Sequence, residues 1–579
     1  YVLGRILQGV TETLLGGNNS FKNLIDSVLS LPVVPENYSS VDAIIDHLMG
    51  EYITQSQYES WGYTIRWMLV TFVFDSDPAE KMDSNSVIVY DGKEEVEATK
   101  DNYRAPSHVA VSLGENSSSE MSITWLTKYS VTGTDIELVP YSENPKFTGI
   151  PTSGKKVNAS YETIGKTYFG ADLGILGLLP YTKDYVKHTI RLSGLEKGTK
   201  YCYRVGDAKR GWWSDAGTIE TASGGDEGFT FFYLTDPQAQ RPDHYNRFAE
   251  VVETAYAEYP DAKFIVSAGD NVDEGKNVKH WNYLLNSTDK LLSLPYMPTT
   301  GNHEDEEAVI TENFILPGVP EQNLDTGVYY SYDYNDVHFT VLNTNDIVDD
   351  KLGNAQLEWL RNDIKSSDAK WKIVVLHKAL YSNGSHFDDG DVEGMRKQLS
   401  SLLPYLGVDL VLQGHDHVYL RTDAMVANSV VPSTTSIAEF DGLEYYVKHN
   451  PKGTIYSICG TSGVKVYQTK DEAETDKSFP RAEKLNTENT DNSMFSAITV
   501  EGDSLYYNAY EVENGEAIRI DNFAIEKTEN DSVSDKAGSF GNIIEGILTT
   551  IDLGFAWQFT NFVFSAIARV MQFFNGILG

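Results

Sequence analysis

Cysteine is scarce in this chain of 579 residues, which contains only Cys202 and Cys459. A dense disulfide framework, of the kind that stabilises small secreted domains, is therefore excluded. The two cysteines lie in separate strand-like runs, TKYCYRV and TIYSICGTS. We predict two buried free thiols rather than a bridge. Stability must come from hydrophobic cores, and a chain of this length predicts more than one.

Basic residues are also few, with 46 Lys and Arg against 84 Asp and Glu and a formal net charge of -38. Binding to nucleic acid is excluded as a main role, because a phosphate backbone is held by clustered Lys and Arg. The acidity favours a soluble protein, and a calcium-decorated or salt-adapted surface is the alternative. The chain starts at Tyr1 without a basic and apolar leader, which is compatible with a signal peptide already removed.

Asn-X-Ser/Thr triplets add weak support for export. Examples begin at Asn37, Asn116, Asn158 and Asn383. We therefore predict a secreted or cell-surface protein.

Long uninterrupted apolar runs are missing as well. The segment Phe540–Gly579 is rich in apolar and aromatic residues, but Gln558, Thr560 and Arg569 interrupt it. A membrane span needs about 18 to 20 apolar residues in succession. We predict one or two amphipathic helices here instead, which pack against the N-terminal helices or a neighbouring subunit and so form a homo-oligomer or higher assembly. Association with a membrane surface is the alternative.

The pattern of apolar residues divides the chain into four regions. Residues 1–100 read as helices with a polar linker at 75–101, and 528–579 as an apolar helical extension. Between them, 105–224 contains short alternating strands with Trp125 early and a Tyr-X-Tyr strand late, which predict a fibronectin-type β-sandwich. Residues 228–527 alternate apolar strands with helices at Tyr245–Tyr256, Asn354–Ser366 and Gly394–Tyr405, which predicts an α/β sandwich. The fold class is therefore multidomain.

Metal-binding residue types follow the predicted strands of the α/β region. They occur in the motifs FTFFYLTD, KFIVSAGD, YMPTTGNH, WKIVVLH and VDLVLQGHDH, as Asp236, Asp270, Asn302, His303, His377, His415 and His417. The carboxyl ends of strands in an open α/β sheet line one crevice. An ordered series of this kind predicts a single site. His338, within a strand, and His47, His108 and His449 have no such context and are interpreted as structural.

The chemistry of these side chains indicates transition metals. Carboxylate and amide oxygens combined with imidazoles suit Fe, Mn or Zn better than calcium. A carboxylate such as Asp270 can bridge two cations, and a pair of cations about 3.5–4 Å apart is the arrangement used for in-line phosphoryl displacement.

The series Asp…GD…GNHE…H…GHDH resembles the signature of the calcineurin-like metallophosphoesterases, and the preceding strands SITWLT and TKYCYRVGD resemble the N-terminal domain of purple acid phosphatases. The resemblance covers about residues 105–527. It implies that Asp236, Asp270 and His417 hold one metal ion. Asn302, His377 and His415 would then hold the other, with Asp270 bridging. It also implies that His303 contacts the substrate and that His386 protonates the leaving group.

Two positions depart from the family pattern. Asp273 stands where the GDxxY motif of the family has its tyrosinate ligand, and we retain Asp273 among the predicted metal ligands. Gln238 stands where related metallophosphoesterases have a histidine. Both departures argue against a ferric ion and against a purple colour.

The resemblance implies an acid phosphatase-like enzyme in which a metal-bound hydroxide at a dinuclear site hydrolyses a small phosphate ester. Two alternatives remain open. The same fold supports a phosphodiesterase or nucleotide pyrophosphatase, and the terminal extensions are compatible with a structural surface protein that retains the domain as a scaffold.

Overall fold

The computed structural model describes residues 105–128, 133–152, 185–305, 309–320, 325–467, 469 and 492–528, together with the backbone of four strands at 87–90, 95–98, 156–163 and 482–485. The helices predicted at both ends of the chain lie outside the described residues. Within the described ranges, no helix has the length and apolarity needed to cross a membrane. One prediction is corrected, because the supposed linker contains an antiparallel pair, β1 (Val87–Tyr90) and β2 (Glu95–Ala98). The β-branched run VIVY favours this strand.

The region after this hairpin folds as two antiparallel sheets. The first has the strand order β3 (Ser107–Leu113), β4 (Met121–Lys128), β7 (Tyr185–Ser193), β6 (Lys156–Thr163). The second has the order β10 (Gly217–Glu220), β8 (Lys200–Asp207), β5 (Asp135–Pro140), with β9 (Trp212–Trp213) also paired to β8. Trp125 is fully buried and its ring stacks on His188 with 5.1 Å between centroids. The predicted sandwich is confirmed, and its assignment to the fibronectin type stays a prediction.

The α/β region contains two larger sheets packed face to face. The eight-stranded sheet has the order β13 (Tyr296–Pro298), β12 (Ile265–Ser267), β11 (Phe229–Leu234), β27 (Ser493–Glu501), β28 (Ser504–Glu513), β29 (Glu516–Glu526), β24 (Leu443–His449), β23 (Thr434–Phe440). The seven-stranded sheet has the order β14 (Tyr330–Tyr334), β15 (Val337–Val341), β18 (Trp371–Lys378), β19 (Leu410–Gly414), β25 (Ile455–Cys459), β20 (Tyr419–Thr422), β26 (Ala482–Leu485).

Strand β18 contributes side chains to two apolar cores, one on each of its faces. Trp371, Ile373 and Val375 belong to the core between the sheets, and Val374 and Leu376 belong to a second core under the outer helices. Because successive side chains of a strand point to opposite faces, a strand buried on both faces is apolar at every position. The stretch IVVL at Ile373–Leu376 has this pattern.

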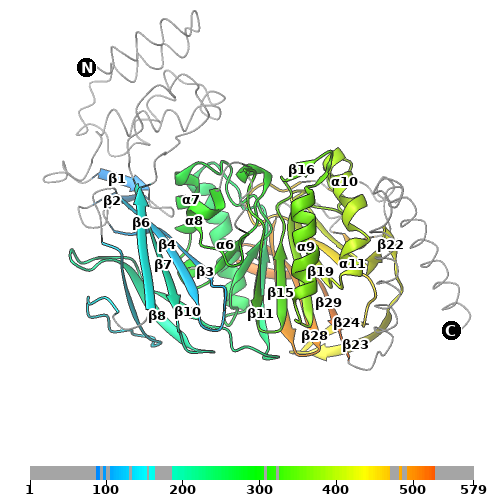
Figure 1. The fold of residues 1–579 in the computed structure, drawn as a ribbon, viewed down its shortest axis with the longest axis horizontal. Helices are drawn as coiled ribbons and strands as arrows, with labels where there is room; N and C mark the ends of the chain where they lie inside the picture. The colour runs from blue at the N-terminus through cyan, green and yellow to red at the C-terminus, as the bar shows by residue number, and fades with distance from the viewer. Residues whose placement is uncertain are drawn as a thin grey trace, which may run out of the picture.

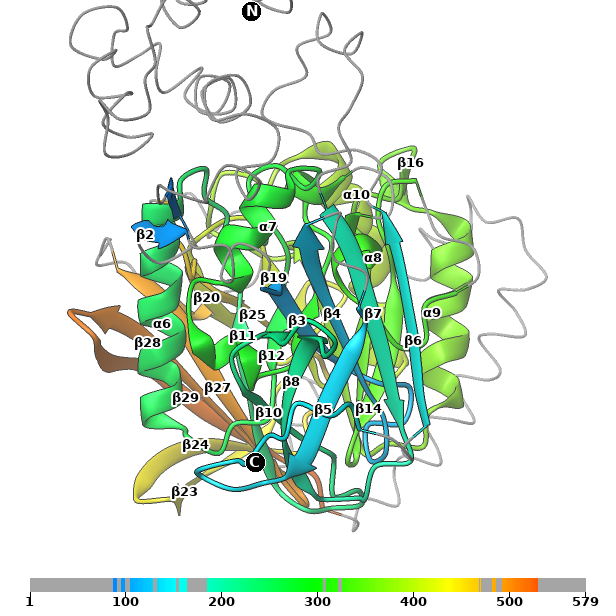
Figure 2. The ribbon, with the colours of Figure 1, turned by 90° about the vertical axis from the view of Figure 1, so that its left-hand side faces the viewer.

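Helices cover the outer faces of the two sheets. Figure 2 shows α6 (Tyr245–Glu258) and α9 (Asn354–Ser366) on opposite sides of the sheets. The predicted bounds of α9 are confirmed, and α6 extends two residues further than predicted. The third predicted helix is divided into α10 (Gly390–Leu399) and α11 (Leu402–Tyr405). Pro404 lacks the amide hydrogen that a continuous helix would require. Within the described ranges, the remaining helices of five residues or more are α7 (Val278–Leu285) and α8 (Val309–Asn313).

The two domains pack against each other along strand β3 (Figure 1). Ser112 donates a hydrogen bond to the carbonyl of Ile315 (2.6 Å), and Tyr203 donates one to the carbonyl of Leu292 (2.9 Å). Buried residues of both domains belong to one continuous apolar core. The sandwich therefore supports the side of the catalytic region on which α7 and β13 lie.

Both cysteines are buried and free. Burial raises the pKa of the Cys459 thiol to about 12. The prediction of two unpaired thiols is confirmed.

Candidate metal centre

The predicted ligands converge at the carboxyl ends of strands from both sheets. Asp236 and Asp270 follow the parallel strands β11 and β12 of the eight-stranded sheet, and Asn302 follows β13. His377 lies on β18, and His415 and His417 follow β19, in the seven-stranded sheet. The site was predicted at the crevice of one sheet. It lies instead where the ends of two packed sheets meet.

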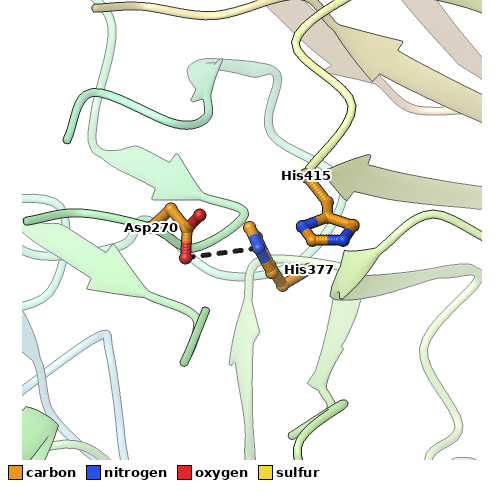
Figure 3. Close-up of side chains that lie close together, drawn as sticks. All are labelled: Asp270, His377 and His415. Atoms are coloured by element: carbon orange, nitrogen blue, oxygen red, sulfur yellow. Dashed lines mark ion pairs between the residues drawn. The ribbon is translucent and has the colours of Figure 1, made fainter. Parts of the chain in front are cut away.

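Two groups of potential ligands share one carboxylate. Asp236, Asp270 and His417 form one group, and Asp270, His377 and His415 form the other, each with donor atoms within 4.8 Å of one another. Figure 3 shows Asp270 and the two imidazoles of the second group facing one another. The Oδ1 atom of Asn302 lies 3.0 Å from Nε2 of His377, so the amide oxygen joins this group. Six of the seven predicted ligands are thus brought together.

Backbone carbonyl groups orient two of the imidazoles. Nδ1 of His377 lies 2.9 Å from the carbonyl oxygen of Ala268, and Nδ1 of His417 lies 2.5 Å from that of Lys465. A carbonyl oxygen only accepts, so each Nδ1 carries a proton and Nε2 is the nitrogen that would bind a cation. Metal-binding histidines are held in this way in proteins.

The backbone at the site is held in an uncommon conformation. Asp236, Asp270, His415 and His417 have φ between 49° and 74°, in the left-handed region that residues with a side chain seldom occupy. Such strain persists where surrounding structure enforces it, often at functional sites. At Gly301, an added Cβ would stand 2.2 Å from Oδ1 of Asp270. The glycine of the GNH motif therefore makes room for a ligand.

The electrostatics of the site favour positive charge at its centre. Burial alone would raise the pKa of Asp270, but His377 and His303 hold it well below its usual range. Burial alone would lower the pKa of His377, but the Asp270 carboxylate raises it to about 9. For His415, burial and then the neighbouring His377 and His386 push the pKa far below its usual value. Asp270 is thus ionised and His415 neutral, which are their metal-binding forms.

The two predicted catalytic histidines lie at the rim of the centre. Nδ1 of His303 lies 2.6 Å from the carbonyl oxygen of Asp273, and Nε2 lies 3.8 Å from Oδ2 of Asp270. The His386 ring stacks near His415 with 4.1 Å between centroids, and its Nδ1 lies 2.8 Å from Oδ2 of Asp389. Both side chains are partly exposed. Each therefore has an Nε2 atom available to an incoming ligand.

Asp273 is the predicted metal ligand that lies apart from both groups. Its carboxylate accepts a hydrogen bond from Nε2 of Gln240 (2.7 Å) and one from Nζ of Lys465 (3.2 Å). Gln238 lies closer to the centre, with Nε2 at 3.3 Å from both Oδ2 of Asp270 and Nε2 of His417. Lys465 was not identified from the sequence, because no motif links it to the site.

Glu304 is a second residue that the sequence analysis did not single out. Its carboxylate accepts hydrogen bonds from the backbone amides of Val272 (2.9 Å) and Gly301 (2.9 Å), and so connects the loops that contain Asp270 and Asn302. Burial, and then the charge of Asp270, raises its pKa to about 8. Its position directly after Asn302 and His303 in the GNHE motif could have indicated that it lies near the site.

The described histidines that were interpreted as structural lie outside these groups. His338 is buried between Asp333 (2.7 Å) and Asp363 (3.0 Å). Burial alone would lower its pKa, but these two carboxylates raise it to about 9. His108 is fully buried. His449 pairs with Glu526 at 3.0 Å. His47 lies outside the described residues.

The residues fit a pair of cations. One carboxylate is shared by two groups, the donors are carboxylate, amide and imidazole, and the buried Oε1 atom of Gln238 has no hydrogen-bond partner among the described residues. These donors suit Fe, Mn or Zn.

Comparison with known proteins agrees with this geometry. A family model for calcineurin-like phosphoesterases matches residues 229–419, and a model for the N-terminal domain of purple acid phosphatases matches 106–221. Purple acid phosphatase 23 of Arabidopsis thaliana is 27% identical over 365 residues, which cover 56% of this chain and 76% of the relative. Acid phosphatase type 7 of Homo sapiens is 24% identical over 296 residues, 48% of this chain and 64% of the relative.

A solved structure shares the fold. Purple acid phosphatase PPD1 from yellow lupin seeds superposes with a TM-score of 0.57 at 18% identity, covering 74% of this chain and 75% of the lupin chain. The model for the N-terminal domain thus matches the sandwich, and the phosphoesterase model matches a large part of the region with the paired sheets. The chain belongs to the calcineurin-like metallophosphoesterases as a purple acid phosphatase-like member, and so to the phosphoric ester hydrolases.

Proposed function

We propose that the protein hydrolyses phosphate esters directly at a dinuclear centre bridged by Asp270. The observation that carries this proposal is the shared carboxylate, because Asp270 belongs to both groups of potential ligands. Asp236 and His417 would complete one cation site. Asn302, His377 and His415 would complete the other.

The bound cations would supply a deprotonated water as nucleophile and would neutralise charge on the phosphoryl group. No covalent intermediate on a thiol is required. Cys202 and Cys459, the two cysteines of the chain, are both buried, and burial keeps the Cys459 thiol protonated.

His303 would bind an oxygen of the phosphoryl group. Its backbone amide donates to Oδ1 of Asp270 (3.0 Å), and its Nδ1 is fixed by the Asp273 carbonyl. The ring is therefore held with Nε2 toward the centre. A protonated Nε2 would donate to an equatorial oxygen, whose charge grows as the transition state forms.

His386 would protonate the leaving group. The Asp389 carboxylate accepts a hydrogen bond from Nδ1 of His386, so that Nε2 is directed away from Asp389. The backbone amide of His386 donates to Oδ1 of Asp416 (2.9 Å), next to the two metal-binding histidines. A general acid in this position would assist departure of a basic alkoxide.

The experiment that tests the function is hydrolysis by the purified chain loaded with Mn²⁺ or Zn²⁺. The panel contains p-nitrophenyl phosphate, an alkyl phosphate, bis-p-nitrophenyl phosphate and a nucleoside triphosphate. We expect two cations per chain and turnover of the monoesters that a chelator abolishes. A preference for the diester or the triphosphate identifies a phosphodiesterase or pyrophosphatase. Two bound cations without turnover of any ester would support a structural protein instead.

We also propose that the protein acts outside the cell. Among the triplets that motivated this prediction, Asn116 is exposed, whereas Asn383 is fully buried. Asn383 is therefore withdrawn as a glycan acceptor, because a glycosylated asparagine must lie on the surface.

A further inference from the structure

Gln238 lies inside the candidate metal centre. Its side chain is 1% exposed. The Nε2 atom is 3.3 Å from Oδ2 of Asp270 and 3.3 Å from Nε2 of His417. Both of these atoms belong to residues of the group that also contains Asp236. The amide of Gln238 therefore faces the same point as the ligands of that group.

The oxygen of this amide is unpaired within the described part of the chain. Oε1 of Gln238 is buried and has no hydrogen-bond partner among the described residues. Leaving a buried acceptor unpaired is costly, because the group has lost water without gaining another partner. A second function of the oxygen would explain why this arrangement is tolerated.

A half-turn of the amide would turn its oxygen toward the centre. Rotation about the Cγ–Cδ bond exchanges Oε1 and Nε2, which have nearly the same shape. The exchange brings Oε1 to the position beside Asp270 and His417. An amide hydrogen cannot face a cation, but an amide oxygen can bind one. A cation held by Asp236, Asp270 and His417 would therefore select the rotated amide.

Asp273, which stands at the position of the tyrosinate ligand of the family, is paired with other side chains. The Asp273 carboxylate is bound by Gln240 and Lys465, and it belongs to neither ligand group. The ammonium of Lys465 already neutralises this carboxylate. The ion pair with Lys465 makes this carboxylate a weaker partner for a cation.

We propose that Gln238, through Oε1, is the fourth protein ligand of the cation held by Asp236, Asp270 and His417, in place of Asp273. This inference rests on the proposed dinuclear function. The amide oxygen is neutral, and the remaining donors of this cation are two carboxylates, one of them shared, and an imidazole. The set suits a divalent cation such as Mn²⁺ or Zn²⁺.

A purely positioning role for Gln238 makes a different prediction. In that role, Nε2 donates to Asp270 and His417, and the oxygen does nothing. Replacement by glutamate separates the two roles, because it keeps the shape, keeps an oxygen and removes the donor.

The experiment is metal binding measured by equilibrium dialysis with Mn²⁺ and with Zn²⁺, followed by elemental analysis. The chains are the wild type, Gln238→Leu, Gln238→Glu and the control Gln240→Leu, which is an equivalent change two residues away. We expect two cations for the wild type and the control. For Gln238→Leu, we expect one of the two sites to weaken by at least about tenfold. For Gln238→Glu, we expect both sites to be retained with equal or higher affinity.

Three outcomes would overturn the inference. The first is unchanged metal binding by Gln238→Leu, and the second is weaker metal binding by Gln238→Glu. The third is loss of a cation site in Gln240→Leu, which would assign the ligand role to Asp273, because Gln240 donates a hydrogen bond to that carboxylate. Gln238→Glu keeps the volume of the side chain, so its circular dichroism and thermal midpoint show whether a loss reflects misfolding. A wild-type chain that binds fewer than two cations would contradict the proposed function itself, which distinguishes the two failures.

Discussion

The Oδ1 atom of Asp270 lies 3.3 Å from Nε2 of His377, although Asp270 follows a strand of one sheet and His377 lies on a strand of the other (Figure 3). Both side chains are buried. The contact therefore exists only when the two sheets are packed together. Formation of the metal centre is coupled in this way to formation of the core beneath it.

Asp270→Asn is expected to lose metal and activity together. The amide cannot supply two anionic oxygens to a pair of cations, and it removes the partner that raises the pKa of His377. We expect turnover to fall by more than about 100-fold, with fewer than two cations per chain. Ester hydrolysis and elemental analysis measure this. Asp243→Asn, which changes an exposed carboxylate paired with Arg241, is the control. A variant with two cations and full turnover would refute the bridging role.

His386→Ala is expected to affect substrates with poor leaving groups most. General acids contribute about 10²- to 10⁴-fold when the departing oxygen is strongly basic. Comparison of kcat for p-nitrophenyl phosphate and an alkyl phosphate measures this selectivity. Asp389→Asn should show the same selectivity with a smaller loss, because Asp389 acts through Nδ1 of His386. Equal losses on both substrates would leave His386 with a binding role only.

The iron-loaded protein is expected to lack a purple colour. Asp273 stands at the tyrosinate position, and its carboxylate is paired with Lys465. Tyr467 is the tyrosine to check, because its ring stacks on His417 with 4.2 Å between centroids. An absorption spectrum after loading with ferric iron tests the prediction. An intense visible band that Tyr467→Phe removes would show that this tyrosine supplies the missing ligand.

The ion pairs of His338 are expected to stabilise the fold in a pH-dependent manner. The folded pKa of about 9 lies above the unfolded value of 6.5. The contribution is therefore fully present below pH 6.5 and is lost as the pH rises through 9. Relative to wild type, His338→Gln should be destabilised on the order of 2 kcal/mol at pH 6 and much less at pH 10. Denaturant unfolding at both pH values measures the difference. His449→Gln, which changes a partly buried histidine paired with Glu526, is the comparison variant.

Asn116 is expected to carry a glycan when the protein passes through a secretory pathway, and Asn383 is not. Asn116 is exposed, and Asn383 is buried with neither side-chain polar atom paired among the described residues. Peptide mass analysis before and after removal of N-glycans checks both positions. A glycan at Asn383 would show that this asparagine is modified before its loop is buried against the core.

The sequence alone determined the features that depend on short segments. Each of the six candidate ligands ends or follows an apolar run that forms a buried strand, in the motifs LTD, GD, GNHE, VLH and GHDH. These candidates were therefore predicted without the fold. The helix at Asn354–Ser366 was predicted with its observed bounds, because its buried residues Leu357, Leu360 and Ile364 repeat at helical spacing.

Only the tertiary structure decided which of two nearby residues faces the centre. Asp273 and Gln238 both stood at motif positions, but Lys465, which is 192 residues beyond Asp273, pairs with that carboxylate. The burial of Asn383 and the pairing of His338 with Asp363 likewise depend on segments distant in the sequence. Spacing along a strand records which face a side chain occupies, but it contains no information on which distant side chain arrives to neutralise a charge or to cover an amide.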